Sequence, residues 1–410
     1  MSHDPGSTEL TEPPIPAPVH PALQAYQQRT RRAMRGYAAV LVLLVLLGFI
    51  AVRIAYAHGE LNKVSASLGQ APAPIPVQAT GTELTRAWQS TDHPAAGNPY
   101  ADGIVVGYDA HTVNGRDALT GAVRWHYTRT DETICSVMQQ DSSTIAIYDH
   151  LGNCDEVTGF VTATGQAKWY RTLTDDGQSS AGSAPNVVVT VAAQSVHVFD
   201  NAGGLDRWNW PAPDGCTVTR ALAGSLGVLI SYRCGSGNHL ILRDEFKDTT
   251  TWTLDTTSAL LPIAASAFVG AVDPATGQLH RYTGAKGTDS ISGQLAATAA
   301  ELTALPRVAT SVSGTDSTGK ANEFIFAGKL FCLSYTGAVA WSAGASSAPW
   351  LVGDRLVAAA DGPGRVVQHR EDGGAAQLTS RLSPAPAAGA RPYPVGGGLL
   401  MSGTDLAMYR

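Results

Sequence analysis

The residues with the most varied chemistry lie in one polar stretch around two cysteines. It contains the segments DETICSV (131–137) and DHLGNCDE (149–156). Carboxylates, a guanidinium and an imidazole in such a stretch can bind a charged or hydrogen-bonding partner. Two interpretations stay open, a recognition loop made rigid by a disulfide or a solvated turn cross-linked for stability. The candidate contact residues are Arg129, Asp131, Glu132, His150, Asn153, Asp155 and Glu156.

Sequence motifs of common enzymes and metal sites are absent. The chain has no Gly-x-Ser-x-Gly, no His-Glu-x-x-His, no P-loop and no EF-hand loop. Asp175-Asp176-Gly177 is more typical of an ordinary turn than of a cation site. The five cysteines form no Cys-x-x-Cys pair and no cluster with histidine. We therefore predict a binding protein that is not an enzyme, with no catalytic residue, no metal and no cofactor.

The elements that position these residues belong to a repeat. Apolar strands, a Thr-Gly or Gly-Gly turn and a strand with Trp recur along the chain. A period of about 40 to 45 residues with four short strands is typical of a β-propeller blade. No amphipathic helix is expected after Thr82. The copies are RDALTGAVRW (116–125), VTATGQAKW (161–169), VFDNAGGLDRW (198–208), CLSYTGAVAW (332–341) and the weaker VDPATGQLHRY (272–282).

The sequence therefore predicts an all-β fold, a β-propeller of about eight four-stranded blades. Seven blades remain possible, because the repeats near 255–300 and 360–410 are faint. LTRAW (84–88) is a Trp strand with no inner strands before it, and residues 395–410 supply inner strands with no Trp strand after them. Pairing the two would complete one blade from both ends of the chain and remove an open sheet edge.

Two aromatic residues, Trp350 and Tyr393, fall at the starts of inner strands. Inner strands border the central channel of a propeller, where such side chains can contact a ligand. The same positions also suit the core between blades. Both residues are therefore candidates for the binding face, with the interblade core as the alternative.

Cysteine spacing predicts two disulfides. Cys135 begins the first strand of one blade and Cys154 precedes its third strand, and Cys216 and Cys234 take the same places two blades later. Antiparallel order brings those positions to one face, which favours the pairs 135–154 and 216–234 over pairings across blades. Each bond would close a loop of about 20 residues, worth roughly 3 kcal/mol, and would indicate an oxidising compartment. Cys332, inside KLFCLSY, is expected to be a buried, inert thiol.

The first 81 residues predict a membrane anchor. Residues 1–35 are rich in proline and end in several arginines, which indicates a disordered cytoplasmic tail. Residues 36–57 (GYAAVLVLLVLLGFIAVRIAYA) are long and apolar enough to cross a membrane as one helix. A signal peptide cleaved after Ala57 is the alternative. Residues 58–81 predict a proline-rich periplasmic spacer and 82–410 the propeller, so the chain is expected in the inner membrane with its C-terminal domain in the periplasm.

Composition narrows the class of partner. Hydrophobic residues make up 44% of the chain, enough for a large core, and charged residues only 15%. The net charge of −6 argues against nucleic acid as a partner, because phosphate contacts need a basic surface. The membrane, contacted through the chain's own helix, and a protein or lipid partner remain.

The Asp-x-x-Thr-Gly-x-x-x-Trp spacing (117–125) resembles the quinoprotein-like (PQQ-like) propeller repeat. The dehydrogenases that share this repeat use a vicinal disulfide and an acidic calcium site. This chain has no adjacent cysteines, so the resemblance does not carry that activity over. The anchor, the cysteine pairs and the segment RWHYTRTDETICSV (124–137) further resemble the membrane-anchored periplasmic propellers of mycolate-making actinobacteria.

This second resemblance implies an adaptor role in the cell envelope. The propeller would assist the transport of the glycolipid trehalose mycolate by binding an inner-membrane lipid transporter or its lipid cargo. The alternatives are a scaffold for the assembly of envelope proteins, a quinone-dependent dehydrogenase-like enzyme, and the outer domain of a sensor. No residue of this chain is assigned to glycolipid contact by the resemblance.

Overall fold

The structure, a computed structural model, describes most of the chain beyond residue 62 and a short part before it. Contacts within the chain divide it into residues 1–62 and residues 63–410. Each unit is considered by itself. The described residues are 34, 37, 40–48 and 63–410, without 77, 141, 174–179, 185, 307, 311–312, 316–319, 353–355 and 371–373.

Residues 40–48 of the first unit are helical, with exposed side chains. Over the described residues, no helix combines the length and the apolar character required to span a membrane. Most of the tail predicted over 1–35 and the remaining positions of the span predicted over 36–57 lie outside the described residues. The Asp175-Asp176-Gly177 turn lies outside them as well.

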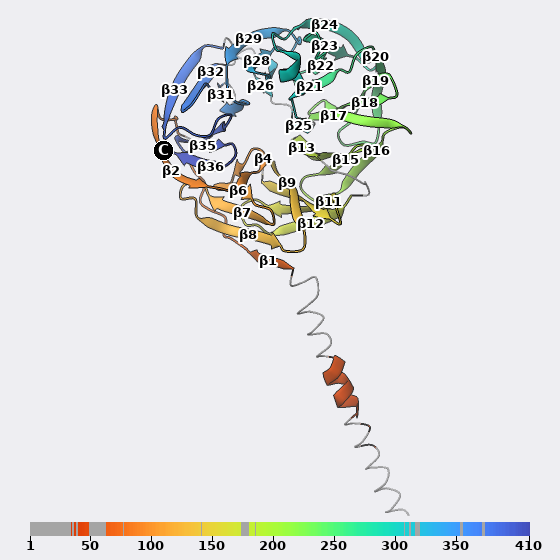
Figure 1. Ribbon diagram of the computed structural model, residues 1–410, viewed down its shortest axis with the longest axis vertical. Helices are drawn as coiled ribbons and strands as arrows, with labels where there is room; N and C mark the ends of the chain where they lie inside the picture. The colour runs from red at the N-terminus through yellow and green to blue at the C-terminus, as the bar shows by residue number, and fades with distance from the viewer. Residues whose placement is uncertain are drawn as a thin grey trace, which may run out of the picture. The chain divides into compact units, whose positions relative to one another are not determined.

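Residues 63–410 form a ring of small, mostly antiparallel sheets around a central axis (Figure 1). Each blade begins near the axis and ends with an outer strand at the rim. In blade 1, β3 (His93–Pro94) and β5 (Tyr100–Ala101) both pair with β6 (Ile104–Tyr108), followed by β7 (Thr112–Asp117) and β8 (Val123–Arg129).

Blades 2 to 4 follow in chain order. Blade 2 consists of β9 (Thr133–Gln140), β10 (Ser143–His150), β11 (Asn153–Val161) and β12 (Ala167–Thr172). Blade 3 consists of β13 (Ser180–Ala184), β14 (Val187–Val191), β15 (Ser195–Asp200) and β16 (Asp206–Pro211). Blade 4 consists of β17 (Cys216–Gly224), β18 (Gly227–Cys234), β19 (Gly237–Arg243) and β20 (Thr250–Thr256).

Blades 5 to 7 repeat the arrangement. Blade 5 consists of β21 (Leu261–Ala265), β22 (Val269–Val272), β23 (Gln278–Thr283) and β24 (Thr288–Gln294). Blade 6 consists of β26 (Ser313–Thr315), β27 (Ala321–Phe326), β28 (Lys329–Leu333) and β29 (Val339–Gly344). Blade 7 consists of β30 (Trp350–Val352), β31 (Leu356–Ala360), β32 (Arg365–Arg370) and β33 (Ala376–Ser383).

Blade 8 joins the two ends of the second unit. Its inner strands are β34 (Arg391–Val395), β35 (Gly398–Ser402) and β36 (Leu406–Tyr409), and its outer strand is β2 (Glu83–Ser90). Strand β2 pairs antiparallel with β36, with Trp88 opposite Met408. The predicted closure by LTRAW is therefore present, and the described strands make eight blades.

The Trp strand holds neighbouring blades together. Trp125 of blade 1 is fully buried, and its Nε1 donates a hydrogen bond to the carbonyl of Thr162 in blade 2 (2.8 Å). Gly165 of blade 2 turns against this ring with φ +72°, and a Cβ there would lie 2.5 Å from the indole. Trp88 repeats the contact on Gly121 of blade 1. The Thr-Gly turn of one blade is thus the surface on which the Trp of the preceding blade packs.

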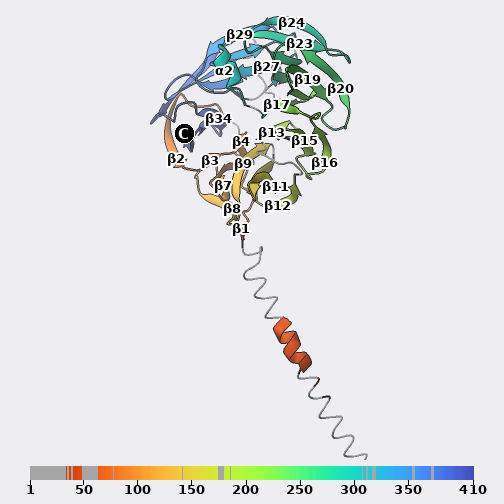
Figure 2. The ribbon, with the colours of Figure 1, turned by 45° about the vertical axis from the view of Figure 1, so that its right-hand side comes forward.

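Three short elements depart from the predicted four-strand repeat. Strand β4 (Ala96–Gly97) pairs parallel with β9, and β25 (Val308–Thr310) pairs parallel with β17, both on the axial side. Helix α2 (Ala299–Thr303), labelled in Figure 2, lies between blades 5 and 6 in the chain. The expectation of no helix after Thr82 concerned amphipathic helices, and this single turn, closed by a Thr298–Glu301 capping box, is too short for one.

Part of the predicted spacer packs on the propeller. Strand β1 (Val64–Ser67) pairs antiparallel with the outer edge of β8. Ile75 contacts the buried cluster at the contact of blades 1 and 8, and Thr80 accepts a hydrogen bond from Gln368 (3.0 Å). The physical reason is that an outer strand leaves unpaired backbone groups, which a passing segment can satisfy.

Both predicted disulfides, Cys135–Cys154 and Cys216–Cys234, are present. The first joins strands β9 and β11 of blade 2, as expected. The second differs in detail, because Cys234 ends the second strand of blade 4 and lies directly opposite Cys216 in the sheet. Cys332 lies outside both bonds and is fully buried.

We predict that Gly165→Ala destabilises the protein far more than Gly152→Ala. Both glycines have positive φ, so either alanine incurs left-handed strain of about 1 kcal/mol. Only at Gly165 would the Cβ also clash with a buried indole; Gly152 has nothing within 4 Å. Thermal unfolding of the two variants measures the difference, and equal losses would contradict the role given to the turn.

Candidate functional site

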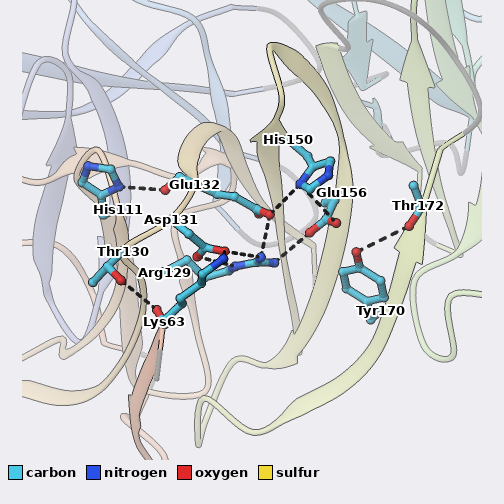
Figure 3. Close-up of polar contacts among 10 residues, drawn as sticks. All are labelled: Lys63, His111, Arg129, Thr130, Asp131, Glu132, His150, Glu156, Tyr170 and Thr172. Atoms are coloured by element: carbon cyan, nitrogen blue, oxygen red, sulfur yellow. Dashed lines mark hydrogen bonds and ion pairs between the residues drawn. The ribbon is translucent and has the colours of Figure 1, made fainter. Parts of the chain in front are cut away.

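The polar stretch predicted from the sequence forms a charged cluster where blades 1 and 2 meet (Figure 3). Its members are Arg129 at the end of β8, Asp131 and Glu132 before β9, His150 at the end of β10 and Glu156 in β11. Because successive strands run antiparallel, the start of β9, the end of β10 and the start of β11 lie at one end of the blade. The cluster is called the Arg129 cluster below.

Arg129 holds the cluster together. Its Nη1 donates to Glu156 Oε2 at 2.8 Å, and its Nη2 donates to Glu132 Oε1 at 2.6 Å and to Asp131 Oδ2 at 3.3 Å. Burial disfavours the charged guanidinium, but the hydrogen bonds to Asp131 and Glu156 outweigh it and raise the pKa of Arg129. Tyr148 packs below, with its ring centroid 5.5 Å from the guanidinium carbon. One cation at the end of β8 therefore fixes three carboxylates, two in the segment before β9 and one in β11.

His150 lies on the exposed side of the cluster and contacts two glutamates that are buried. His150 Nδ1 lies 3.1 Å from Glu132 Oε1 and 3.8 Å from Glu156 Oε1. The hydrogen bond to Glu132 raises the pKa of His150, and burial raises the pKa of Glu132. Burial also acts on Glu156, but hydrogen bonds with Tyr170 and Arg129 outweigh it and lower the pKa of Glu156. The cluster thus combines the Arg129 cation with three carboxylates and a histidine whose charge is favoured by the neighbouring Glu132.

Three of these side chains have the composition of a metal site. One ligand atom each from Glu132, His150 and Glu156 lies within 4.8 Å of the others. Arg129 hydrogen-bonds both carboxylates, so a divalent cation would have to compete with its guanidinium. The arrangement is better suited to binding a cationic or hydrogen-bonding group of a partner. Glu132 Oε2 is buried and has no hydrogen-bond partner within the described part of the chain.

The segment before the propeller also reaches the cluster. Lys63 Nζ lies 3.6 Å from Asp131 Oδ2, and the Lys63 carbonyl accepts the backbone N–H of Thr130 at 2.9 Å. Strand β1 begins at the next residue. The contact of Lys63 with Asp131 was not predicted from the sequence, because residues 58–81 were expected to form a spacer.

An exposed leucine beside the cluster was also missed. Leu151 is 89% exposed at the tip of the β10–β11 hairpin and has φ +54°. Leu151 and Gly152 form a two-residue turn, in which Asn-Gly is the favoured pair. A leucine with positive φ is strained, and such outliers gather at functional sites. The signal in the sequence that could have identified Leu151 as a candidate was an apolar residue in a turn, between His150 and a glycine.

Two of the remaining candidates lie next to the cluster. Asn153 pairs with His150 across the hairpin, and burial raises the pKa of Asp155. Asp155 Oδ1 is buried and has no hydrogen-bond partner among the described residues. The disulfide between Cys135 and Cys154 lies beside them.

Trp350 and Tyr393 lie apart from the cluster. Their ring centroids are 5.0 Å apart, and both rings contact the Arg391 guanidinium. Tyr393 is 3% exposed, and its hydroxyl donates to the carbonyl of Gly97 at 2.7 Å. These surroundings fit the second of the two alternatives for Trp350 and Tyr393, a position in the core between blades, because Tyr393 belongs to a buried apolar cluster and Trp350 packs against it.

Comparison with known proteins defines the fold. No family model matches the chain, and no curated protein matches it. Among solved structures, the designed protein Ika8 is 14% identical, with a TM-score of 0.51, and covers 80% of this chain and 100% of its own. The C-terminal WD40 domain of Sif2 is 8% identical, with a TM-score of 0.50, and covers 80% and 98%. BamB from Moraxella catarrhalis is 15% identical, with a TM-score of 0.46, and covers 80% and 99%.

WD40 domains are β-propellers, so the likeness to Sif2 and the ring of blades agree. The chain is a β-propeller protein. At these identities the likeness concerns the fold alone.

We predict that Glu132→Gln lowers the pKa of His150 toward its ordinary value of about 6.5. The hydrogen bond to the carboxylate raises this pKa, so its stabilising effect is complete below pH 6.5 and is lost as pH rises through the folded-state pKa. A ring-resonance NMR titration from pH 5 to 9 measures it. Glu83→Gln, an exposed position on β2, is the control and should leave His150 unchanged.

Proposed function

We propose that this protein is a non-enzymatic adaptor of the cell envelope. It is tethered to the inner membrane by residues 36–57, with the propeller in the periplasm. It assists glycolipid transport by binding an inner-membrane lipid transporter or its cargo, trehalose mycolate. The transporter is the partner that the chemistry of the Arg129 cluster favours, since charged groups in fixed positions suit a protein surface.

The observation that carries the proposal is the surface around the tip of the β10–β11 hairpin of blade 2. Leu151 projects from a hairpin tip beside His150, and Tyr170 is half exposed on the neighbouring outer strand. Tyrosine and arginine are enriched in binding hot spots, and an exposed leucine beside them adds apolar surface that a partner can bury. The disulfide between Cys135 and Cys154 and the Arg129 ion pairs keep this surface in one conformation, which reduces the entropy lost on binding.

The charged groups support binding more than catalysis. Each terminal nitrogen of Arg129 already hydrogen-bonds a carboxylate, and His150 contacts two of those carboxylates. These groups stabilise one another instead of activating a nucleophile. A tether to the membrane would raise the local concentration of the propeller near membrane partners to about the millimolar range.

The second candidate function is that of a scaffold for the assembly of envelope proteins. The outer edge of β8 accepts β1 as an additional antiparallel strand over Val64–Ser67. A client strand could add to such an edge in the same way, through main-chain hydrogen bonds. This candidate would use the rim of blade 1 and not the tip of the β10–β11 hairpin.

We predict that Leu151→Ser weakens binding to the purified periplasmic domain of the trehalose mycolate transporter about tenfold or more. The full chain is immobilised, and the transporter domain and trehalose mycolate in liposomes are applied separately. Leu205→Ser is the control, because Leu205 is 58% exposed in a turn of another blade, between β15 and β16 of blade 3.

If Leu151→Ser loses binding to the transporter domain and Leu205→Ser keeps it, the result supports the tip of the β10–β11 hairpin of blade 2 as the contact surface. Binding of glycolipid liposomes that Leu151→Ser abolishes would make the cargo, not the transporter, the partner. If the unmodified chain binds neither probe, the glycolipid transport role is wrong.

A further inference from the structure

A buried arginine in blade 4 has no counter-charge among the residues that the structure describes. Arg220 lies in β17, the innermost of the four blade strands, and is 4% exposed. Its Nε is buried with no hydrogen-bond partner, and no ion pair reaches the side chain among the described residues. Burial lowers the pKa of Arg220 to about 10, and no acidic group in the described part of the chain opposes this effect. A guanidinium removed from water without an acceptor is costly, so the site is electrostatically incomplete.

The direction of Arg220 follows from a bulge in β17. Cys216, Val218, Ala221 and Ala223 all belong to the core between blades 3 and 4. The register of β17 against β18 shifts between Val218 and Arg220, and the bulge resets the alternation of side chains. Arg220 therefore lies with Leu222 on the opposite side of the strand, away from the blade 3 core.

That side of β17 changes from exposed to buried along the strand. Thr217 and Thr219 are exposed, whereas Leu222 is 3% exposed. Arg220 lies at the boundary between them. Thr219 Oγ1 already hydrogen-bonds Ser231, at 2.9 Å to the carbonyl and 2.7 Å to the hydroxyl. The Thr217 hydroxyl is at the exposed end and can donate to a bound group.

We propose that Arg220 anchors an anion-binding site on the inner strand of blade 4, which takes a phosphate, sulfate or carboxylate group. The planar guanidinium offers paired N–H donors that match the oxygens of such groups. The anion would supply the acceptor that Arg220 Nε does not find among the described residues. The site is separate from the Arg129 cluster, which lies in blades 1 and 2 and already has its carboxylates.

The test compares unfolding of the full chain in phosphate and in chloride at equal ionic strength. Phosphate should raise the melting temperature of the unmodified protein. In Arg220→Met the response should vanish, and calorimetric affinity for phosphate should fall about tenfold or more. The variant should also be at least as stable in chloride, because an uncompensated buried charge has been removed. Arg233→Met, at an exposed arginine of the adjacent β18, should keep the full phosphate response.

The source of the anion is distinguished by a second probe. Vesicles of phosphatidylglycerol are compared with vesicles of phosphatidylcholine. A response to inorganic phosphate indicates a soluble anion, and a response confined to phosphatidylglycerol indicates a lipid headgroup; each must depend on Arg220. If Arg220→Met does not fold, Arg220→Lys is used, and it should bind phosphate more weakly because the paired donors are gone. No response to either probe, or a response unchanged in the Arg220 variant, overturns the proposal.

Discussion

The packing of one blade's tryptophan on the next blade's glycine turn is the contact on which the ring depends. Trp125 is fully buried against Gly165, and its indole N–H reaches a carbonyl of the same neighbouring blade. A four-stranded sheet cannot bury both faces alone, so each blade is stable only between two neighbours. Trp88 makes the same contact from the N-terminal strand to blade 1, and the ring thereby has no free end.

This packing also explains how the Arg129 cluster is built. Arg129 ends the strand that carries Trp125, while Glu132 and Glu156 belong to the blade on which Trp125 packs. The packing of Trp125 on Gly165 sets the relative position of the two blades. The ion pairs of Arg129 then form between groups whose positions this packing has already fixed. The disulfide and the bulges of blade 2 then bring its first and third strands together near His150. A surface fixed in this way loses little entropy on binding a partner.

Short-range pattern predicted the blades and the cysteine pairs, because each depends on spacing within about 45 residues, and the incomplete repeats at the two ends of the propeller predicted the closure between β2 and β36. The polar cluster was predictable for the same reason, since its members flank consecutive strands. The pairing of residues 64–67 was not predictable, because VSAS is a short run with three small residues and nothing in it indicates its partner strand β8. Burial of Arg220 was equally hidden, because the bulge at Thr219 changes which residues face the core. Leu151 was missed because leucine is not a residue that two-residue turns favour.

The central claim is that the ring is closed by β2 and that the rest of the propeller depends on this closure. The most direct test is thermal unfolding of the chain after deletion of residues 83–90, compared with deletion of residues 64–67, which removes the exposed strand β1 from the surface of blade 1. The account predicts a large, cooperative fall in melting temperature for the first deletion and a small change for the second. An unchanged melting temperature after loss of β2 would contradict it.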